Sequence, residues 1–91
     1  MTLTIVAPTG TLCDTTTDRV SFPGTVGRFT VLKDHAPLIA GLASGEIVYN
    51  TEAGEARLRI RNGCVRVFEN RIEACVEPSE AAPEKGEERA R

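Results

Sequence analysis

Apolar and polar residues alternate along several short segments of this 91-residue chain, and this alternation limits what the chain can fold into. Successive side chains of a strand point to opposite sides, so a period of two is typical of strands with one buried face. No window before residue 77 has convincing helical spacing. The apolar residues predicted to share the buried side are Leu3 and Ile5, Val20 and Phe22, Phe29 and Val31, Leu58 and Ile60, Val65 and Val67, and Ile72, Ala74 and Val76.

Turn-forming residues separate these segments and a further short strand predicted over residues 46–50. The turns are predicted at Pro8-Thr9-Gly10, Pro23-Gly24, Glu52-Ala53-Gly54 and Glu69-Asn70. Short strands at this spacing predict an all-β fold, a flattened sandwich or barrel of mainly antiparallel strands. Asn62-Gly63 fits either a two-residue hairpin or a bend where one strand passes between sheets, and the pattern leaves both open.

The composition changes at Glu77, after which Pro78, Pro83 and Gly86 stand among Glu, Ala, Lys and Arg without an apolar face. Such a segment buries too little surface to offset the entropy of ordering it. We therefore predict one β-domain over residues 1–77 and a disordered, mixed-charge tail over residues 78–91. A short frayed helix over residues 83–91 is the alternative.

The charges of the predicted domain cancel, since residues 1–76 carry eight basic and eight acidic side chains. The formal charge of −2 comes from residues 77–91, with three basic and five acidic groups. A neutral domain lacks the field that steers proteins to nucleic acid or anionic lipid. The first residues lack the basic and apolar stretches of a signal peptide, and no segment approaches the ~20 apolar residues of a membrane span. We expect a cytosolic protein that can still dock on a membrane complex.

The sequence has few residues that could form a catalytic or metal-binding site. The chain has three cysteines, Cys13, Cys64 and Cys75, and no CxxC spacing. The odd number and the missing spacing argue against a disulfide framework or a zinc site. Their apolar neighbours predict buried, reduced thiols. His35 is the one histidine, so no second base can complete a nucleophilic pair around it. We interpret His35 as a loop residue that makes a backbone hydrogen bond, and a hydrolase using it is the weaker interpretation.

Three arginines, Arg57, Arg59 and Arg61, fall on one face of a predicted strand. They suggest an alternative function, a small OB-like barrel that binds RNA through this stripe. A solvated outer face is favoured over RNA binding because acidic side chains are available across neighbouring strands. These are Glu46, Glu52, Glu55 and Glu73.

The block from Pro23 to Leu38 differs from the rest because two glycines and two prolines fix unusual backbone positions around a short strand. The apolar stretch that follows, with Ile39 and Leu42, is neither alternating nor clearly helical. Loops that interrupt a sheet in this way often carry recognition. The block is therefore predicted to be an interaction surface.

The same block carries a family resemblance over residues 2–77. Its motif reads Pro23-Gly24-x-x-Gly27-x-Phe29-x-Val31-Leu32-x-x-His35-Ala36-Pro37-Leu38, supported by Pro8-x-Gly10, Leu42-x-x-Gly45-Glu46-Ile47, and Gly63 ahead of Val65-x-Val67. In this order the residues resemble the N-terminal β-sandwich of the epsilon subunit of bacterial F-type ATP synthase. Departures are Cys13 and Cys64 in place of larger apolar residues, which predict a less filled core, Thr30 in place of a glycine, and Val26 in place of an acidic residue.

The resemblance implies a non-catalytic rotor subunit, without cofactor or metal, that joins the gamma subunit to the ring of c subunits. It implies that Val26, Gly27 and Arg28 face the c-ring, and that the gamma contact is made by His35, Ala36, Pro37, Leu38 and Leu42. The expected location is peripheral, on the cytoplasmic side of the inner (plasma) membrane. The residues after Val76 are too few for the two-helix hairpin of the family, so we predict coupling without hairpin-based inhibition.

Overall fold

The computed structural model describes residues 1–79, which form eight strands. The strands are β1 (Thr2–Ala7), β2 (Gly10–Thr16), β3 (Arg19–Gly24), β4 (Gly27–Leu32), β5 (Leu38–Leu42), β6 (Gly45–Thr51), β7 (Gly54–Phe68) and β8 (Arg71–Pro78). Their order in the sheet is β2-β1-β8-β7-β5-β3-β4, and β6 pairs with β3 and β7. Only the β1–β8 pair is parallel among these strands. The prediction of an all-β, mainly antiparallel fold is confirmed.

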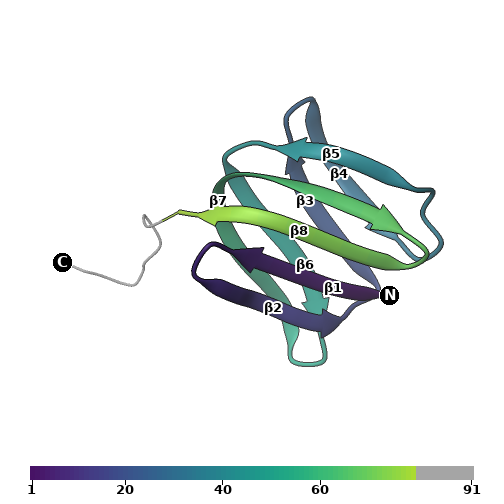
Figure 1. Cartoon of the computed structure of the whole chain (residues 1–91). Coiled ribbons are helices and arrows are strands. Elements are labelled where there is room, and N and C mark those ends of the chain that lie inside the picture. The colour runs from purple at the N-terminus through teal and green to yellow at the C-terminus, as the bar shows by residue number, and fades with distance from the viewer. Residues whose placement is uncertain (80–91) are drawn as a thin grey trace.

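The 15-residue strand β7 turns the sheet over on itself. Its first half pairs with β6 and its second half with β5 and β8, so the strands form two layers (Figure 1). The register with β8 shifts between Ile60 and Asn62. Asn62-Gly63 is therefore the bend between layers and not a hairpin. The Glu69-Asn70 turn is confirmed, and both residues have positive φ, at 48° and 60°.

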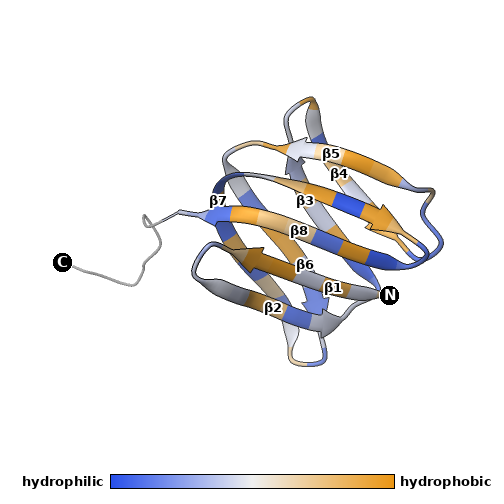
Figure 2. Cartoon of the chain, viewed as in Figure 1, coloured by the Kyte–Doolittle hydropathy of each residue, from blue (hydrophilic) through white to orange (hydrophobic). Residues whose placement is uncertain are grey.

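The core lies between the two layers and consists of aliphatic side chains around one aromatic pair. Buried and exposed residues alternate along β8, as the period of two predicts. Figure 2 shows hydrophilic residues among the hydrophobic ones of this strand. The rings of Phe22 and Phe29 stack with centroids 5.5 Å apart. The buried apolar residues are Leu3, Ile5, Val20, Phe22, Val31, Leu42, Ile47, Ile60, Val65, Val67, Ile72, Ala74 and Val76.

Two strands, β2 and β5, were not predicted. β2 is mostly polar and exposed, and it is a strand because β1 provides backbone partners along its length. β5 pairs along its whole length with β7 and meets β3 at Leu42. β2 pairs with the preceding strand β1 and β5 with the distant strand β7, and a local pattern of apolar residues reports neither pairing.

The prediction of buried cysteines is wrong. Cys64 and Cys75 are exposed and Cys13 is half-buried, and all three thiols are free. The inward positions of the same strands belong to valines and an alanine, so Cys64 and Cys75 point outward. Cys64 consequently leaves no gap in the core, contrary to what its place in the family pattern suggested.

The tail predictions lie largely outside the described residues, which end at Ser79; within them β8 continues through Pro78. Across residues 1–79, no helix has the length and apolar character that crossing a membrane requires.

Candidate functional site

The β3–β4 hairpin projects from the body of the molecule (Figure 1) and carries Val26 at its tip. Gly24 and Gly27 form the last cross-strand pair before the turn. Gly27 has a φ of +136°, a backbone conformation that favours glycine. The Val26 side chain is 100% exposed. The turn therefore presents an apolar side chain to solvent at the end of a narrow projection.

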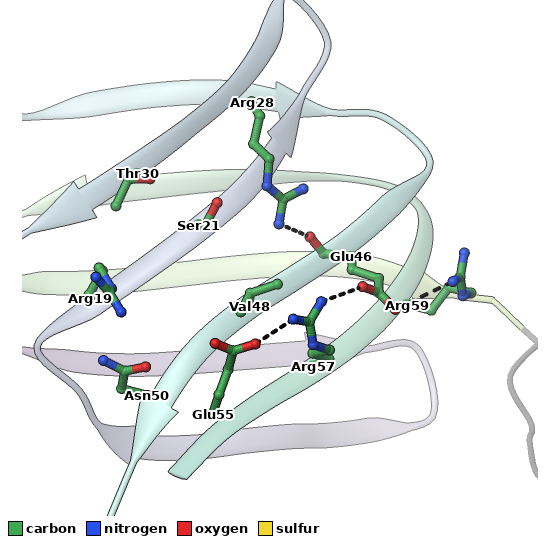
Figure 3. A pocket seen from close by; sticks show the side chains of 10 residues that line it. All are labelled: Arg19, Ser21, Arg28, Thr30, Glu46, Val48, Asn50, Glu55, Arg57 and Arg59. Carbon is green, nitrogen blue, oxygen red and sulfur yellow. Dashed lines mark hydrogen bonds and ion pairs between the residues drawn. The ribbon is translucent and has the colours of Figure 1, made fainter.

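Arg28 follows the tip, but its side chain turns back toward β6. Its Nη2 donates a hydrogen bond of 2.6 Å to the backbone carbonyl of Glu46. Figure 3 shows the Arg28 guanidinium beside Glu46, at the edge of an open polar hollow that Arg57 and Arg59 also line. The tip and the Arg28 charge are thus neighbours that face different directions.

The base of the hairpin is fastened to the end of β5. The Thr25 amide donates to the Gly41 carbonyl at 3.1 Å, and the Ala43 amide donates to the Pro23 carbonyl at 2.7 Å. Leu42, which was predicted to contact gamma, is paired with β3 here and only 2% exposed. Leu42 therefore supports the hairpin from the core and does not belong to the accessible surface.

The loop between β4 and β5 holds the other predicted contact residues. The Asp34 amide donates to Asn70 Oδ1 at 2.7 Å, and Asn70 Nδ2 donates to Asp34 Oδ1 at 3.0 Å. The His35 backbone amide donates a hydrogen bond to the Leu32 carbonyl at 3.1 Å. The ring Nδ1 of His35 lies 2.7 Å from the Ala36 carbonyl oxygen. The interpretation of His35 as a loop residue with a backbone hydrogen bond is confirmed. The loop is held by this bond and by the two bonds to Asn70 in the turn between β7 and β8.

The predicted contact residues divide between the two ends of β5. His35, Ala36 and Pro37 are exposed at its start, next to half-buried Leu38, whereas Leu42 lies four residues later, about 14 Å along an extended strand. Sequence reasoning missed Ile39 as a surface residue, although its side chain is 78% exposed. Recognising residues 38–42 as a strand would have placed Ile39 on the outer face.

The arginine stripe is neutralised and does not form a single basic face. Arg57 and Arg59 share Glu46, at 3.1 and 3.3 Å, and Arg57 also pairs with Glu55 (Figure 3). The hydrogen bond to Glu46, followed by the charge of Glu55, raises the pKa of Arg57 above its ordinary value. Arg61, at the register shift, reaches the carboxylate of Glu77 on β8, 3.8 Å away.

Two of the acidic side chains expected to neutralise the stripe, Glu46 and Glu55, do so, and Glu73 pairs with Arg66. Among residues 1–79, no three His, Cys, Asp or Glu side chains gather into a possible metal site. What distinguishes the molecule is thus the projecting hairpin and the anchored loop at the opposite end of β5.

Comparison with known proteins gives these surfaces a context. Residues 1–82 match the family model described as the β-sandwich domain of the ATP synthase delta/epsilon chain. The ATP synthase epsilon chain of Symbiobacterium thermophilum is 37% identical over 83 residues, covering 90% of this chain and 60% of that one. The epsilon chain of Trichlorobacter lovleyi is 33% identical over 91 residues, covering 100% and 66% respectively. This chain thus spans about two thirds or less of the length of these relatives.

Two solved structures share the fold at low sequence identity. One, from the central stalk and c-ring of Tetrahymena thermophila mitochondrial ATP synthase, has a TM-score of 0.72 at 14% identity and covers 85% of this chain and 63% of that one. The other, from the OSCP/F1/c-ring structure of Euglena gracilis mitochondrial ATP synthase, has a TM-score of 0.74 at 18% identity and covers 81% and 48%. With the match across residues 1–82, the chain belongs to the family of ATP synthase delta/epsilon β-sandwich domains.

Proposed function

We propose that this chain is a non-catalytic part of the central stalk of an F-type ATP synthase, where it links the gamma subunit to the c-ring. Family membership over residues 1–82 carries the proposal. The Tetrahymena structure of similar fold comes from a central stalk and c-ring, which supports it. In this role the protein is peripheral, on the cytoplasmic side of the inner membrane, and it transmits rotation and performs no reaction of its own.

The hairpin tip is the proposed c-ring contact. Val26 supplies exposed apolar surface, whose burial stabilises docking, and Arg28 supplies a charge near the tip that tunes the choice of partner. The backbone bonds between Thr25 and Gly41 and between Ala43 and Pro23 attach the hairpin to the end of β5. A projection fastened at its base in this way resists bending, which a joint under torque requires.

The start of β5 is the proposed gamma contact. His35, Ala36 and Pro37 lie in a loop that the Asp34–Asn70 hydrogen bonds hold in place. We add exposed Ile39 to this surface and assign buried Leu42 a supporting role. Because β5 runs from the gamma side to the base of the hairpin, one paired strand connects both contacts.

Affinity purification under mild detergent tests this function. The tagged chain should recover both gamma and c subunits, and Val26→Asp should lose c subunits while keeping gamma, because a charge replaces the apolar tip. Thr9→Asp, in the exposed turn between β1 and β2, is the matched control and should keep both partners. Recovery of neither partner from wild type would overturn the proposal. Recovery of RNA that depends on Arg57 and Arg59 would favour the alternative, which their pairing with Glu46 disfavours.

We also propose that the tail, residues 78–91, takes no part in inhibition, as predicted from the sequence. Removing it should leave ATP hydrolysis by the assembled synthase unchanged. A strong change in the hydrolysis rate would contradict this part of the proposal and leave the stalk assignment intact.

A further inference from the structure

The antiparallel pair β7–β8 carries four cross-strand residue pairs on its outer face. In order along the ladder these are Asn62 with Glu77, Cys64 with Cys75, Arg66 with Glu73, and Phe68 with Arg71. The two cysteines therefore stand directly opposite each other, and both are exposed with free thiols.

The neighbouring pairs show that side chains on this face meet across the two strands. Asn62 Nδ2 donates to Glu77 Oε1 at 3.2 Å, and Arg66 Nη2 lies 2.6 Å from Glu73 Oε1. The guanidinium of Arg71 lies 6.0 Å from the centre of the Phe68 ring. The cysteine pair lies between rungs of the ladder whose side chains are already in contact.

Opposed positions also satisfy the distance requirement of a disulfide. Opposite Cα atoms of an antiparallel pair are about 4.5–5.5 Å apart, and disulfides span Cα separations of about 4.4–6.8 Å. On the other sides of the pair, Gly41 of β5 lies opposite Cys64 and has no side chain to cover the sulfur, and Val6 of β1 lies opposite Cys75, which is nevertheless exposed. The two positions therefore meet the Cα-distance requirement of a disulfide, and both side chains are exposed to a reagent.

We propose that Cys64 and Cys75 form a redox-active dithiol, which small disulfides of the glutathione class oxidise to a cross-strand disulfide. One cysteine thiolate attacks the small disulfide, which forms a mixed disulfide and releases one small thiol. The second cysteine thiolate attacks the protein sulfur of the mixed disulfide and releases the second small thiol. Two electrons pass from the protein to the small disulfide, and the two protons lost by the cysteines balance those gained by the released thiols.

The disulfide would bind β7 to β8 in their present register. It closes a loop around the Glu69-Asn70 turn and so restricts the unfolded chain more than the folded one. In a reducing compartment, disulfides are usually transient and either catalytic or redox-sensing, and a non-catalytic domain leaves the sensing role. The dithiol belongs to the domain itself, so its oxidation does not require a place in the central stalk.

Oxidised glutathione added to the reduced, purified chain tests the proposal by thiol titration and mass spectrometry. Titratable thiols should fall from the three cysteines of the sequence to one. The product should be a monomer with Cys64 linked to Cys75, its melting temperature should rise, and dithiothreitol should reverse both changes. Cys13→Ser should retain the linkage, whereas Cys64→Ser and Cys75→Ser should each remove it.

A variant with one cysteine moved along β8 tests whether oxidation depends on the two thiols being directly opposite each other or only on their general reactivity. In the double variant Glu73→Cys with Cys75→Ser, the new partner of Cys64 is a diagonal neighbour, about 7–8 Å away, and should oxidise much more slowly. The proposal is overturned if wild type retains three thiols, ends as stable glutathione adducts or linked dimers, or oxidises no faster than this variant.

Discussion

Gly63 lies at the bend of β7, close to the backbone of β8. A Cβ at this position would lie 2.5 Å from the carbonyl oxygen of Cys75 and 2.9 Å from Val76 Cγ1. The first contact is with backbone, which cannot move without disturbing the β7–β8 ladder. Gly63→Ala is therefore expected to lower the free energy of unfolding by about 2–3 kcal/mol, measured by urea denaturation.

Gly41→Ala is the matched control for this prediction. A Cβ at Gly41 would lie 3.4 Å from Thr25 Cγ2, an ordinary contact on an exposed strand. Its effect should stay within about 0.5 kcal/mol. Equal losses in the two variants would show that the close approach at Gly63 is not what makes glycine necessary there.

Tyr49 provides a prediction about alkaline pH. Burial, and secondly a hydrogen bond with Cys13, raise the pKa of Tyr49 from 10.0 to about 12. Because the folded pKa is the higher one, the resulting stability is complete below pH 10 and is lost as the pH rises through about 12. Tyr49→Phe should abolish this part of the alkaline loss of stability.

Tyr49 is the one tyrosine, and the chain has no tryptophan, so tyrosinate absorbance reports it directly. The titration midpoint of the folded chain should lie near 12, well above the ordinary 10.0. Cys13→Ala should lower the midpoint only in part, because burial is the larger cause. A wild-type midpoint at the ordinary value would refute the raised pKa.

At the scale of elements, sequence reasoning predicted strands with one buried face and missed those defined by pairing. β8 was evident because Ile72, Ala74 and Val76 alternate with charged or exposed residues. β5 was not, because Gly41 and Ala40 give little contrast between its faces. The cysteines were misplaced for a related reason: hydrophobicity suggested burial, although strand parity points Cys64 and Cys75 outward.

The candidate site was predictable in part. Proline and glycine located the hairpin and the β4–β5 loop, because these residues restrict backbone geometry locally. The exposure of Ile39 and the burial of Leu42 depend on which strand each residue pairs with, so they required the three-dimensional structure.

The link between the β4–β5 loop and the β7–β8 turn yields the next prediction. Asn70→Gly keeps the positive φ of this turn but removes both side-chain bonds to Asp34. We expect a loss of about 1–2 kcal/mol in stability, faster hydrogen exchange at the Asp34 amide, and weaker gamma binding. Asn50→Ala, which removes one exposed bond to Asp18, should leave gamma binding unchanged. Unaltered exchange at Asp34 in Asn70→Gly would contradict a locked loop.

Across the whole molecule, the proposed contacts occupy opposite ends of β5 and share no side-chain partner among those described. Val26 stands on the hairpin beyond Gly41 and Leu42, whereas His35 precedes Leu38. The four-residue step along β5 alone spans about 14 Å, and effects of substitutions more than about 7–10 Å apart usually add. Val26→Asp should therefore weaken attachment to the c-ring, and His35→Ala attachment to gamma, independently of each other.

The double variant Val26→Asp with His35→Ala tests this independence. Its loss of binding free energy to a purified complex of gamma and c-ring should equal the sum of the single losses within about 0.5 kcal/mol. Thermal unfolding of Val26→Asp alone should match wild type, because the Val26 side chain is 100% exposed and contributes no packing. A coupling well above that margin would mean that both residues act on one shared contact, and the two-ended joint would then be wrong.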